Sequence, residues 1–392
     1  MRVLQLGKYY YPYMGGIENH LYLLCNELKS RVDLDVLVCN SEGKTVTEQV
    51  DGVRVTRAAQ RAHAASTSLC PTMPLEVSRR RYDVMHIHFP HPMGVMSYLF
   101  SHRPQKHAVV VTWHSDIVKQ ERLLRLYRPF MNRVLARASA IICTSPNYLE
   151  GSESLLPYRD KCHVMPYGID VSQFEKTEAI AKEAAAIRAR FGGRPLLLGV
   201  GRLIYYKGFE VAVRAMREVE AELLLVGSGP LRVPLEKMAR ECGVAEKVHF
   251  IGEVHNQALA PYYFASDAYV LPSIARSEAF AIVQLEAMAC GLPVVNTSIA
   301  RSGVPFVSRD GESGLTVPPE DVAAFARAVN TILGDRELAR RFGDAGRARV
   351  KREFSKEVMR ERMLALYRDV APAKSGVAEA SGGGQSALRA AE

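Results

Sequence analysis

Short apolar runs alternate with amphipathic segments along most of the chain. In the first half, the runs that we predict to be buried strands span 2–7, 34–38, 53–56, 82–88, 108–113 and 140–145. In the second half, the pattern recurs at 195–201, 222–229, 248–252, 268–272 and 294–297. Segments of helical period follow most of these runs; 18–29, for example, places Leu21, Leu24 and Leu28 on one face. Strands that alternate with helices predict an α/β fold with parallel, doubly wound sheets.

The length of the chain and the repeat of this pattern predict two domains. At 392 residues the chain exceeds the size of one ordinary hydrophobic core. We expect a first domain over 1–170, an Ala-rich helical linker over 171–193, a second domain over 194–353 and a last helix over 354–370. Residues 371–392 hold fourteen Ala, Gly or Ser in twenty-two positions, which predicts a disordered tail.

Hydropathy and cysteine content indicate a cytoplasmic protein. No apolar run reaches the roughly 18 residues that cross a bilayer, and the apolar stretch at the N-terminus is too short for a signal peptide. The seven cysteines are scattered and form no Cys-x-x-Cys pair. This arrangement favours a reducing compartment and disfavours a zinc site.

Positive charge is concentrated in one part of the first half. The net charge is +9, and the window 79–137 holds eleven Lys or Arg against three Asp or Glu, a net of +8. Within it, 118–138 alternates apolar residues with arginines, and we expect Pro129 to kink or divide this helix. A basic amphipathic helix is typical of a contact with an anionic membrane surface. A core helix with a solvated arginine face fits the same pattern.

The segment 277–291 has the features of a ligand site. It lies between two predicted strands, and it holds Glu278 in a loop and Glu286 about two helical turns later. In parallel sheets, ligands sit where a strand ends and the next helix begins. The amides of Ala281, Ile282 and Val283 would open that helix, and free amides with a positive dipole end suit a phosphate. The alternative is an amphipathic helix with two solvated glutamates.

Five further residues are predicted to lie where a strand of a sheet ends. Gly15-Gly16 separates a strand from a helix, and His114 follows the strand 108–113. Arg202 and Lys207 follow the first strand of the second half, so two cations meet the anion-binding helix start that a diphosphate leaving group needs. For Gly15-Gly16 the alternative is a mobile turn, and for His114 it is a structural or exposed histidine.

Metal sites are not expected. His86, His88 and His91 cluster at one strand end, but no carboxylate or cysteine accompanies them at ligand spacing. Asp33-Leu-Asp35 resembles the Asp-x-Asp motif of some sugar transferases, yet it starts a strand and so lies at the wrong end for a site. We therefore predict neither a metal nor another cofactor.

Several motifs, in order along residues 1–370, resemble the family 4 retaining glycosyltransferases of the GT-B fold. These motifs occupy 11–16, 112–114, 164–170, 201–203 with 207–208, 227–230, 277–280 and 286–295. The resemblance implies two Rossmann-like domains that face each other across a cleft, with the helix 354–370 crossing back to the first domain. It also implies a nucleotide-sugar donor bound mainly to the second domain, and transfer without a metal.

The resemblance assigns roles to matching positions. Arg202 and Lys207 would hold the diphosphate, Glu278 would contact the donor hexose, and Glu286 would bind the ribose hydroxyls. His114 matches the family histidine near the transferred sugar, and we count it as catalytic together with Glu278, Arg202 and Lys207. We expect Glu278→Ala to abolish transfer while the protein stays folded.

The glycine loop and the start of the second-domain helix complete the implied donor site. Gly16 lets the first-domain loop approach the diphosphate, and Phe280 is counted with the donor-binding residues. The family often has glycine after the first glutamate and after the phenylalanine, where this chain has Ala279 and Ala281. This departure puts the donor identity in doubt.

These observations predict a retaining hexosyltransferase that builds a cell-surface glycan on a lipid-linked or polysaccharide acceptor. GDP-mannose is the expected donor, and the inner face of the plasma membrane is the expected location. Three alternatives stay open: another GT-B enzyme such as a nucleotide-sugar epimerase or a phosphorylase, an inactive sugar-binding protein, and a nucleic-acid-binding protein that uses the basic window. Few aromatics interleave those arginines, so we expect no nucleic acid partner.

Overall fold

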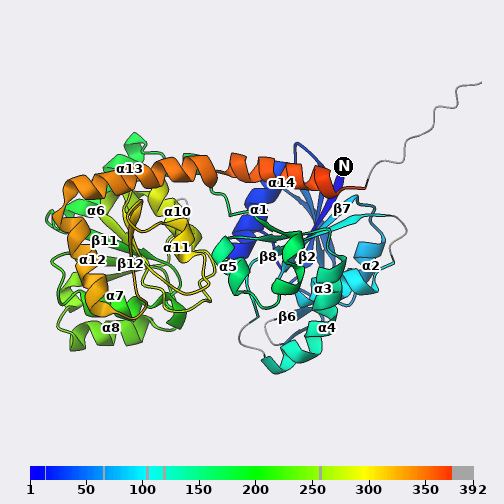
Figure 1. Cartoon of the computed structure of the whole chain (residues 1–392), viewed down its shortest axis with the longest axis horizontal. Coiled ribbons are helices and arrows are strands. Elements are labelled where there is room, and N and C mark those ends of the chain that lie inside the picture. The colour runs from blue at the N-terminus through cyan, green and yellow to red at the C-terminus, as the bar shows by residue number, and fades with distance from the viewer. Residues whose placement is uncertain (14, 65–66, 103–105, 118–120, 256–257, 373–392) are drawn as a thin grey trace, which may run out of the picture.

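The computed structural model describes residues 1–13, 15–64, 67–102, 106–117, 121–255 and 258–372. Two parallel sheets with helices on both faces form the two ends of the molecule (Figure 1). The first sheet uses strands between residues 2 and 164, and the second uses strands between residues 196 and 317. Nearly all of the predicted disordered tail, from residue 373 on, lies outside the described residues.

The first sheet has eight strands in the order β10-β9-β8-β7-β1-β2-β4-β3. Their bounds are β1 Arg2–Leu6, β2 Asp33–Cys39, β3 Val46–Val50, β4 Val53–Ala58, β7 Val84–Phe89, β8 Ala108–Trp113, β9 Ala140–Cys143 and β10 Cys162–Val164. All six residues of β7 and all six of β8 are buried. Continuous burial is expected for central parallel strands because helices cover both faces of the sheet.

Some strands and helices of the first half were not predicted from the sequence. The edge strand β3 pairs antiparallel with β4, and four of its five residues are exposed. The stretch 60–75, which is not among the segments predicted from the sequence, holds the hairpin of β5 Ala62–Ala64 and β6 Thr67–Leu69 and the start of α2 Met73–Ser78. Short polar edge strands carry little hydrophobic signal, so pattern alone does not find them.

Helices cover the first sheet. The longer ones are α1 Gly16–Leu28, α3 Pro92–Phe100 and α4 Glu121–Arg137, and the short ones are α5 Pro146–Gly151 and η1 Leu156–Lys161. η2 Val171–Phe174 follows them, and its Phe174 lies in the hydrophobic core of the second half. Pro129 lies inside α4, and the helix continues through it. The sequence predicted a kink or a division at this proline, and α4 is not divided there.

The second sheet has six parallel strands in the order β13-β12-β11-β14-β15-β16. Their bounds are β11 Leu196–Val200, β12 Glu222–Val226, β13 Val248–Gly252, β14 Ala268–Val270, β15 Val294–Thr297 and β16 Gly314–Val317. The edge strand β16 is not among the strands predicted from the sequence. The helices of this half are α6 Glu178–Ala189, η3 Tyr205–Lys207, α7 Phe209–Ala215, α8 Arg232–Glu241, η4 Ala245–Lys247, α9 Ala260–Ala265, α10 Ile282–Ala289, α11 Val304–Val307 and α12 Val322–Gly334.

Two consecutive helices run along one side of both sheets. α13 Arg336–Glu353 packs on α10, and α14 Lys356–Val370 packs on α1 of the first half, so the last described helix lies against the first half (Figure 1). The Lys356 ammonium lies 2.8 Å from the Asp170 carboxylate, and Arg360 lies 2.9 Å from Glu27 on α1. These contacts hold α14 against the first half.

Candidate active site

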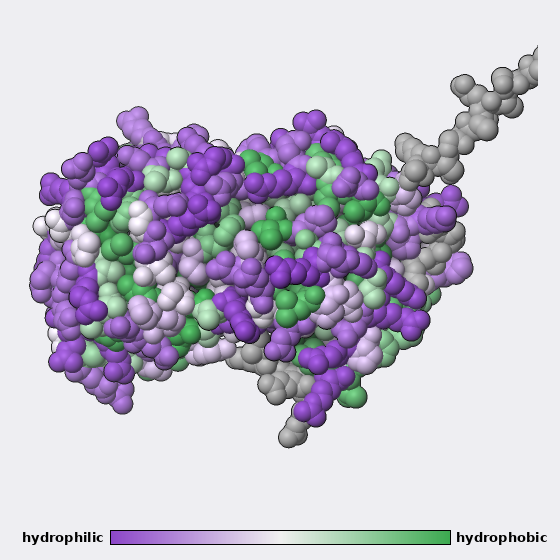
Figure 2. All heavy atoms as spheres, viewed as in Figure 1, coloured by the Kyte–Doolittle hydropathy of each residue, from purple (hydrophilic) through white to green (hydrophobic). Residues whose placement is uncertain are grey.

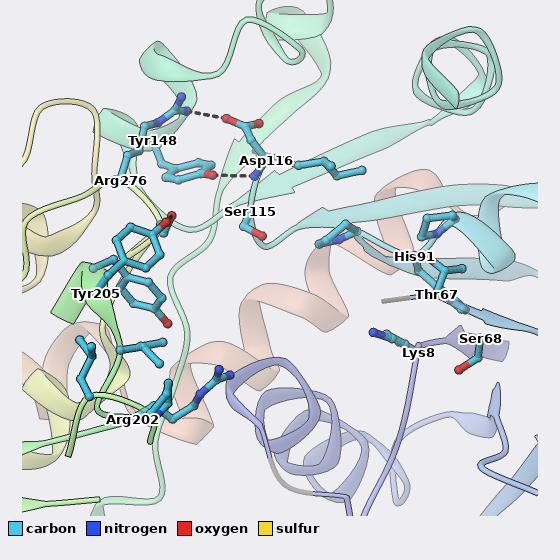
Figure 3. Close-up of a pocket in the computed structure, with 18 residues that line it drawn as sticks. Lys8, Thr67, Ser68, His91, Ser115, Asp116, Tyr148, Arg202, Tyr205 and Arg276 are labelled. Atoms are coloured by element: carbon cyan, nitrogen blue, oxygen red, sulfur yellow. Dashed lines mark hydrogen bonds and ion pairs between the residues drawn. The ribbon is translucent and has the colours of Figure 1, made fainter. Parts of the chain in front are cut away.

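A cavity of about 580 Å³ is lined by residues of both halves of the chain. Lys8, Ser68 and His91 come from the first half, and Arg202 and Tyr205 come from the second (Figure 3). The second-half wall begins directly after β11, and Ser115 on the opposite wall follows β8. Both walls therefore lie at carboxyl ends of parallel strands, where ligands bind in open α/β sheets.

Glu278 and Lys207 form a buried ion pair beside this cavity. The Lys207 ammonium lies 2.6 Å from Oε2 of Glu278, and the two side chains are only 9% and 10% exposed. The Ser273 hydroxyl donates a hydrogen bond of 3.2 Å to the same carboxylate oxygen. The sequence predicted both residues for one site, but it did not predict that each is the other's partner. A donor diphosphate that takes up Lys207 must therefore compete with Glu278.

The start of α10 leaves amides open near Glu278. Ala281 is the N-cap residue, with φ of 64°, in the left-handed region that alanine seldom adopts. The first amide with a backbone acceptor in this turn is that of Gln284, which donates to Ala281. Ile282 and Val283 open the helix as the sequence indicated, since the first amides of a helix have no acceptor within it.

The Phe280 side chain does not face a ligand. It is 2% exposed and packs edge-to-face on Tyr167, with ring centroids 5.0 Å apart, and on Phe354 at 6.2 Å. Only the backbone of Phe280 is therefore suited to bind a donor. Its ring instead joins the loop of Glu278 to the segment 164–170, which links the two halves.

Glu286 lies about one turn into α10 and accepts a hydrogen bond of 2.7 Å from the Tyr263 hydroxyl. Burial raises the pKa of the Glu286 carboxyl above its usual range, which the hydrogen bond from Tyr263 and the charge on Lys207 partly offset. One carboxylate oxygen is thus held by the protein. The predicted contact with ribose hydroxyls stays a prediction.

A carboxylate from the first turn of α1, that of Glu18, lies against the glycine loop. Gly15 caps α1 with extended backbone, and a Cβ on it would lie 2.3 Å from the Glu18 carboxylate. A Cβ on Gly16 would meet no atom within 4 Å, so space at Gly16 does not by itself demand glycine. Burial raises the pKa of Glu18. The acidic side chain at the start of α1 is a feature that the sequence analysis overlooked.

His114 lies within a buried set of hydrogen-bonded side chains that we call the histidine network. Its members are Gln5, His86, His88, Thr112, His114, Tyr167 and Tyr367. His114 is 2% exposed; its Nε2 lies 3.0 Å from Nδ1 of His88, and its Nδ1 lies 2.5 Å from the Tyr167 hydroxyl. His114 therefore contacts protein at both ring nitrogens, and it is the next residue, Ser115, that reaches the cavity.

Two residues that sequence reasoning missed join the halves across the cavity. The Arg276 guanidinium lies 2.7 Å from the Asp116 carboxylate, and it stacks over the Tyr148 ring at 4.8 Å (Figure 3). Asp116 also accepts from Trp113 Nε1 at 2.9 Å and from the Ser152 hydroxyl at 2.7 Å. The only signal in the sequence was the position of Asp116 just after a strand end.

The described part of the chain shows neither a metal site nor a membrane-spanning helix. Within those residues, no group of three or more His, Cys, Asp or Glu is arranged to hold a metal ion. In the same part of the chain, no helix combines the length and the apolar composition needed to cross a membrane. The ring nitrogens of His86, His88 and His114 are paired with neighbouring protein groups.

Comparison with known proteins identifies the family of the chain. The family described as glycosyl transferases group 1 matches residues 181–349, and glycosyltransferase family 4 matches residues 14–173. The O-antigen chain mannosyltransferase C of Escherichia coli is 33% identical over 379 residues, which cover 96% of this chain and 100% of that protein. The chain belongs to glycosyltransferase family 4. A D-rhamnosyltransferase of Pseudomonas aeruginosa is 35% identical over 91% of this chain and 92% of its own length.

Solved structures of glycosyltransferases share the fold. A sucrose-phosphate synthase from Thermosynechococcus elongatus superimposes with a TM-score of 0.75 at 25% identity, over 94% of this chain and 99% of that one. The predicted GT-B fold and the predicted glycosyltransferase activity are confirmed by these matches. The individual residue roles stay predictions.

Proposed function

We propose that this glycosyltransferase is a retaining, metal-independent enzyme that moves a mannose unit from GDP-mannose to a lipid-linked glycan. The observation that carries the proposal is the Lys207–Glu278 pair beside the open start of α10, with Arg202 exposed in the cavity wall. Fixed positive groups around a leaving diphosphate supply the stabilisation of developing charge that a metal otherwise gives. Glu278 would orient the hexose.

The reaction exchanges one bond for another at the anomeric carbon. The bond from C1 to the diphosphate oxygen breaks, and a bond from C1 to the acceptor oxygen forms on the same face. The acceptor proton passes to the departing phosphate oxygen, so the products are a glycoside and GDP. Arg202, Lys207 and the α10 amides would hold the charge that the diphosphate gains.

The choice of donor rests on relatives. A GDP-mannose-dependent mannosyltransferase of Mycolicibacterium smegmatis is 28% identical over 86% of this chain, and the E. coli relative is named for mannose. The P. aeruginosa relative is named for D-rhamnose, which is D-mannose without the C6 hydroxyl. GDP-D-rhamnose is therefore the second candidate.

The proposed membrane contact rests on α4. Its inner face, with Met131, Val134 and Leu135, is buried in the first-half core. Leu126 on the same helix is 74% exposed, and Phe100 on α3 is 65% exposed. The other exposed residues of this α3–α4 patch are Leu123, Phe130, Arg125 and Arg128. Hydrophilic and hydrophobic residues lie side by side at the lower edge of the first-half end, where α4 lies (Figure 2).

The function test is a transfer assay with a lipid-linked acceptor extract. GDP-mannose, GDP-D-rhamnose and UDP-glucose would be compared with and without EDTA, and the anomeric configuration of the product would be read by NMR. We expect transfer from GDP-mannose, unchanged by EDTA, with retained configuration. An inverted product, or loss of activity with EDTA, would contradict the mechanism. Transfer only from GDP-D-rhamnose would show that GDP-D-rhamnose, and not GDP-mannose, is the donor.

The membrane test compares two equally exposed apolar residues. Leu126→Glu in the α3–α4 patch should reduce flotation with vesicles that contain anionic phospholipid. Val233→Glu on α8 is the matched control, because Val233 is 70% exposed but belongs to the second half. Equal flotation of the two variants and the wild type would contradict the assignment of this surface.

A further inference from the structure

The histidine network forms one continuous series of hydrogen bonds beneath the cavity. His86 Nδ1 lies 2.6 Å from the Tyr367 hydroxyl, and His86 Nε2 lies 2.6 Å from Thr112 Oγ1. Gln5 joins Tyr367 to His88: its Nε2 lies 2.9 Å from the Tyr367 hydroxyl, and its Oε1 lies 2.9 Å from His88 Nε2. With the His88–His114 and His114–Tyr167 bonds, the series joins the C-terminal helix to the segment that links the two halves.

The Gln5 amide sets the direction of every bond on one side of it. Since Gln5 Oε1 can only accept, His88 Nε2 must carry a hydrogen and donate. A neutral His88 then accepts at Nδ1, so His114 donates from Nε2. A neutral His114 in turn accepts at Nδ1, so the Tyr167 hydroxyl donates to it.

The surroundings keep these rings neutral. Both His88 and His114 are buried, and burial, together with the neighbouring histidines, lowers the pKa of each well below its usual value. The groups that face them are the rings of His86, Tyr167 and His20, the last of which lies on α1 with its centroid 5.5 Å from that of His114. No carboxylate takes part in the hydrogen bonds of the network.

We propose that Gln5, His88 and Tyr167 are positioning residues that hold His114 as the neutral Nε2–H tautomer, with its Nδ1 lone pair directed to the Tyr167 hydroxyl. Tyr167 packs on Phe280 two positions after Glu278, so the same series ties the donor loop to the first sheet. The consequence for catalysis rests on the proposed function. Because both nitrogens of His114 are engaged, it orients groups and does not accept the acceptor proton, which leaves that role to the donor phosphate.

The first test reads tautomers directly. Protein labelled with ¹⁵N-histidine gives distinct ring-nitrogen shifts and two-bond couplings for Nδ1–H, Nε2–H and charged rings, and His88→Asn and His114→Asn assign the signals. We expect both rings to be neutral Nε2–H tautomers at pH 7.5. Nδ1–H tautomers at both sites would mean that the series runs in the opposite direction, and a charged ring at either site would break it; each result would overturn the proposal.

The second test uses a matched pair of buried glutamines. Gln5→Met removes the acceptor of His88, whereas Gln5→Glu keeps an acceptor oxygen there. Gln284→Met is the control for the tautomer measurement alone, because Gln284 is equally buried but lies on α10 outside the network. We expect mixed tautomers at His114 only in Gln5→Met, with a kcat lower by about tenfold to hundredfold and a donor KM changed little, as for a misplaced catalytic group.

The two readouts separate this inference from the proposed function. The tautomers are measured without donor or acceptor, so the result does not depend on which sugar the enzyme transfers. A Gln5→Met protein with wild-type tautomers and wild-type kcat would refute the positioning role. Inactivity of the wild type towards GDP-mannose, with the expected tautomers, would refute only the choice of donor.

Discussion

The buried Lys207–Glu278 ion pair allows a prediction about the stability of the protein and about its affinity for GDP. The two side chains are about nine-tenths buried and 2.6 Å apart, so each charge depends on the other for compensation. Removing one partner of such a pair costs about 3–5 kcal/mol because an unpaired charge stays buried, whereas replacing both partners by neutral groups is often close to neutral. We therefore expect Glu278→Gln and Lys207→Met each to destabilise the protein by about 3 kcal/mol.

The double variant decides whether this reasoning holds. We expect it to be more stable than either single variant, which is a coupling of at least about 3 kcal/mol between the two sites. Urea unfolding of all four proteins, followed by circular dichroism at one pH, measures this coupling. Additive losses, or single-variant losses below about 1 kcal/mol, would show that the pair is solvated and would refute the argument. The ion pair also changes the expectation that Glu278→Ala leaves folding unaffected.

Binding of GDP should separate the two partners. In Glu278→Gln the Lys207 ammonium is released for the diphosphate, so GDP affinity should stay equal or rise. In Lys207→Met the affinity should fall by about tenfold or more, which corresponds to the loss of one hydrogen bond to a charged group. Isothermal titration calorimetry measures both. Weaker binding in both variants to the same extent would mean that Lys207 does not hold the diphosphate.

Three further predictions concern stability. Burial lowers the pKa of His20 to about 4 and that of His86 to about 3, so below pH 6.5 the unfolded chain binds more protons than the folded protein. Lowering the pH from 7 to 5.5 should therefore reduce the free energy of unfolding by about 1.2 kcal/mol per histidine. Equal urea midpoints at both pH values would contradict this. Ala281→Gly relieves a left-handed alanine and should destabilise the protein by about 1–2 kcal/mol less than Ala287→Gly in the interior of α10, as thermal unfolding of the two variants would show. Arg276→Met removes the ion pair between the halves and should lower the unfolding free energy by about 1–3 kcal/mol, with no loss expected if the pair is solvated.

The central strands were predictable because burial on both faces leaves a local signature. β8, Ala-Val-Val-Val-Thr-Trp, and β9, Ala-Ile-Ile-Cys, are continuous apolar runs that nothing but a covered parallel sheet explains. β3 and β16 lack that signature because they lie at sheet edges. The order of strands was not predictable from the same pattern, since it depends on crossovers that periodicity does not encode.

The sequence predicted where the candidate site residues lie, but it did not predict which of them contact each other. The rule that ligands bind at carboxyl ends of parallel strands located Arg202, Lys207 and Glu278 near one edge. It could not show that Lys207 reaches Glu278, because the contact joins side chains that are seventy-one positions apart, and its geometry depends on the turn at Gly208. The sequence placed His86 and His88 near the end of one strand, where β7 holds them, yet Gln5 and Tyr367, which bind them, lie on other elements.

The two halves of the chain complete each other at the cavity. Tyr367 of the last helix is fully buried in the first-half core and hydrogen-bonds to Gln5 on β1, while Tyr167 of the linking segment packs in the second-half core against Phe280. His114 lies between these two tyrosines in the histidine network. A rotation of one half against the other must therefore keep the Tyr167–His114 bond or break it, and breaking it would leave a buried hydroxyl and a buried ring nitrogen unpaired. Because each unpaired group costs about 1–3 kcal/mol, this bond favours one arrangement of the donor loop over the others.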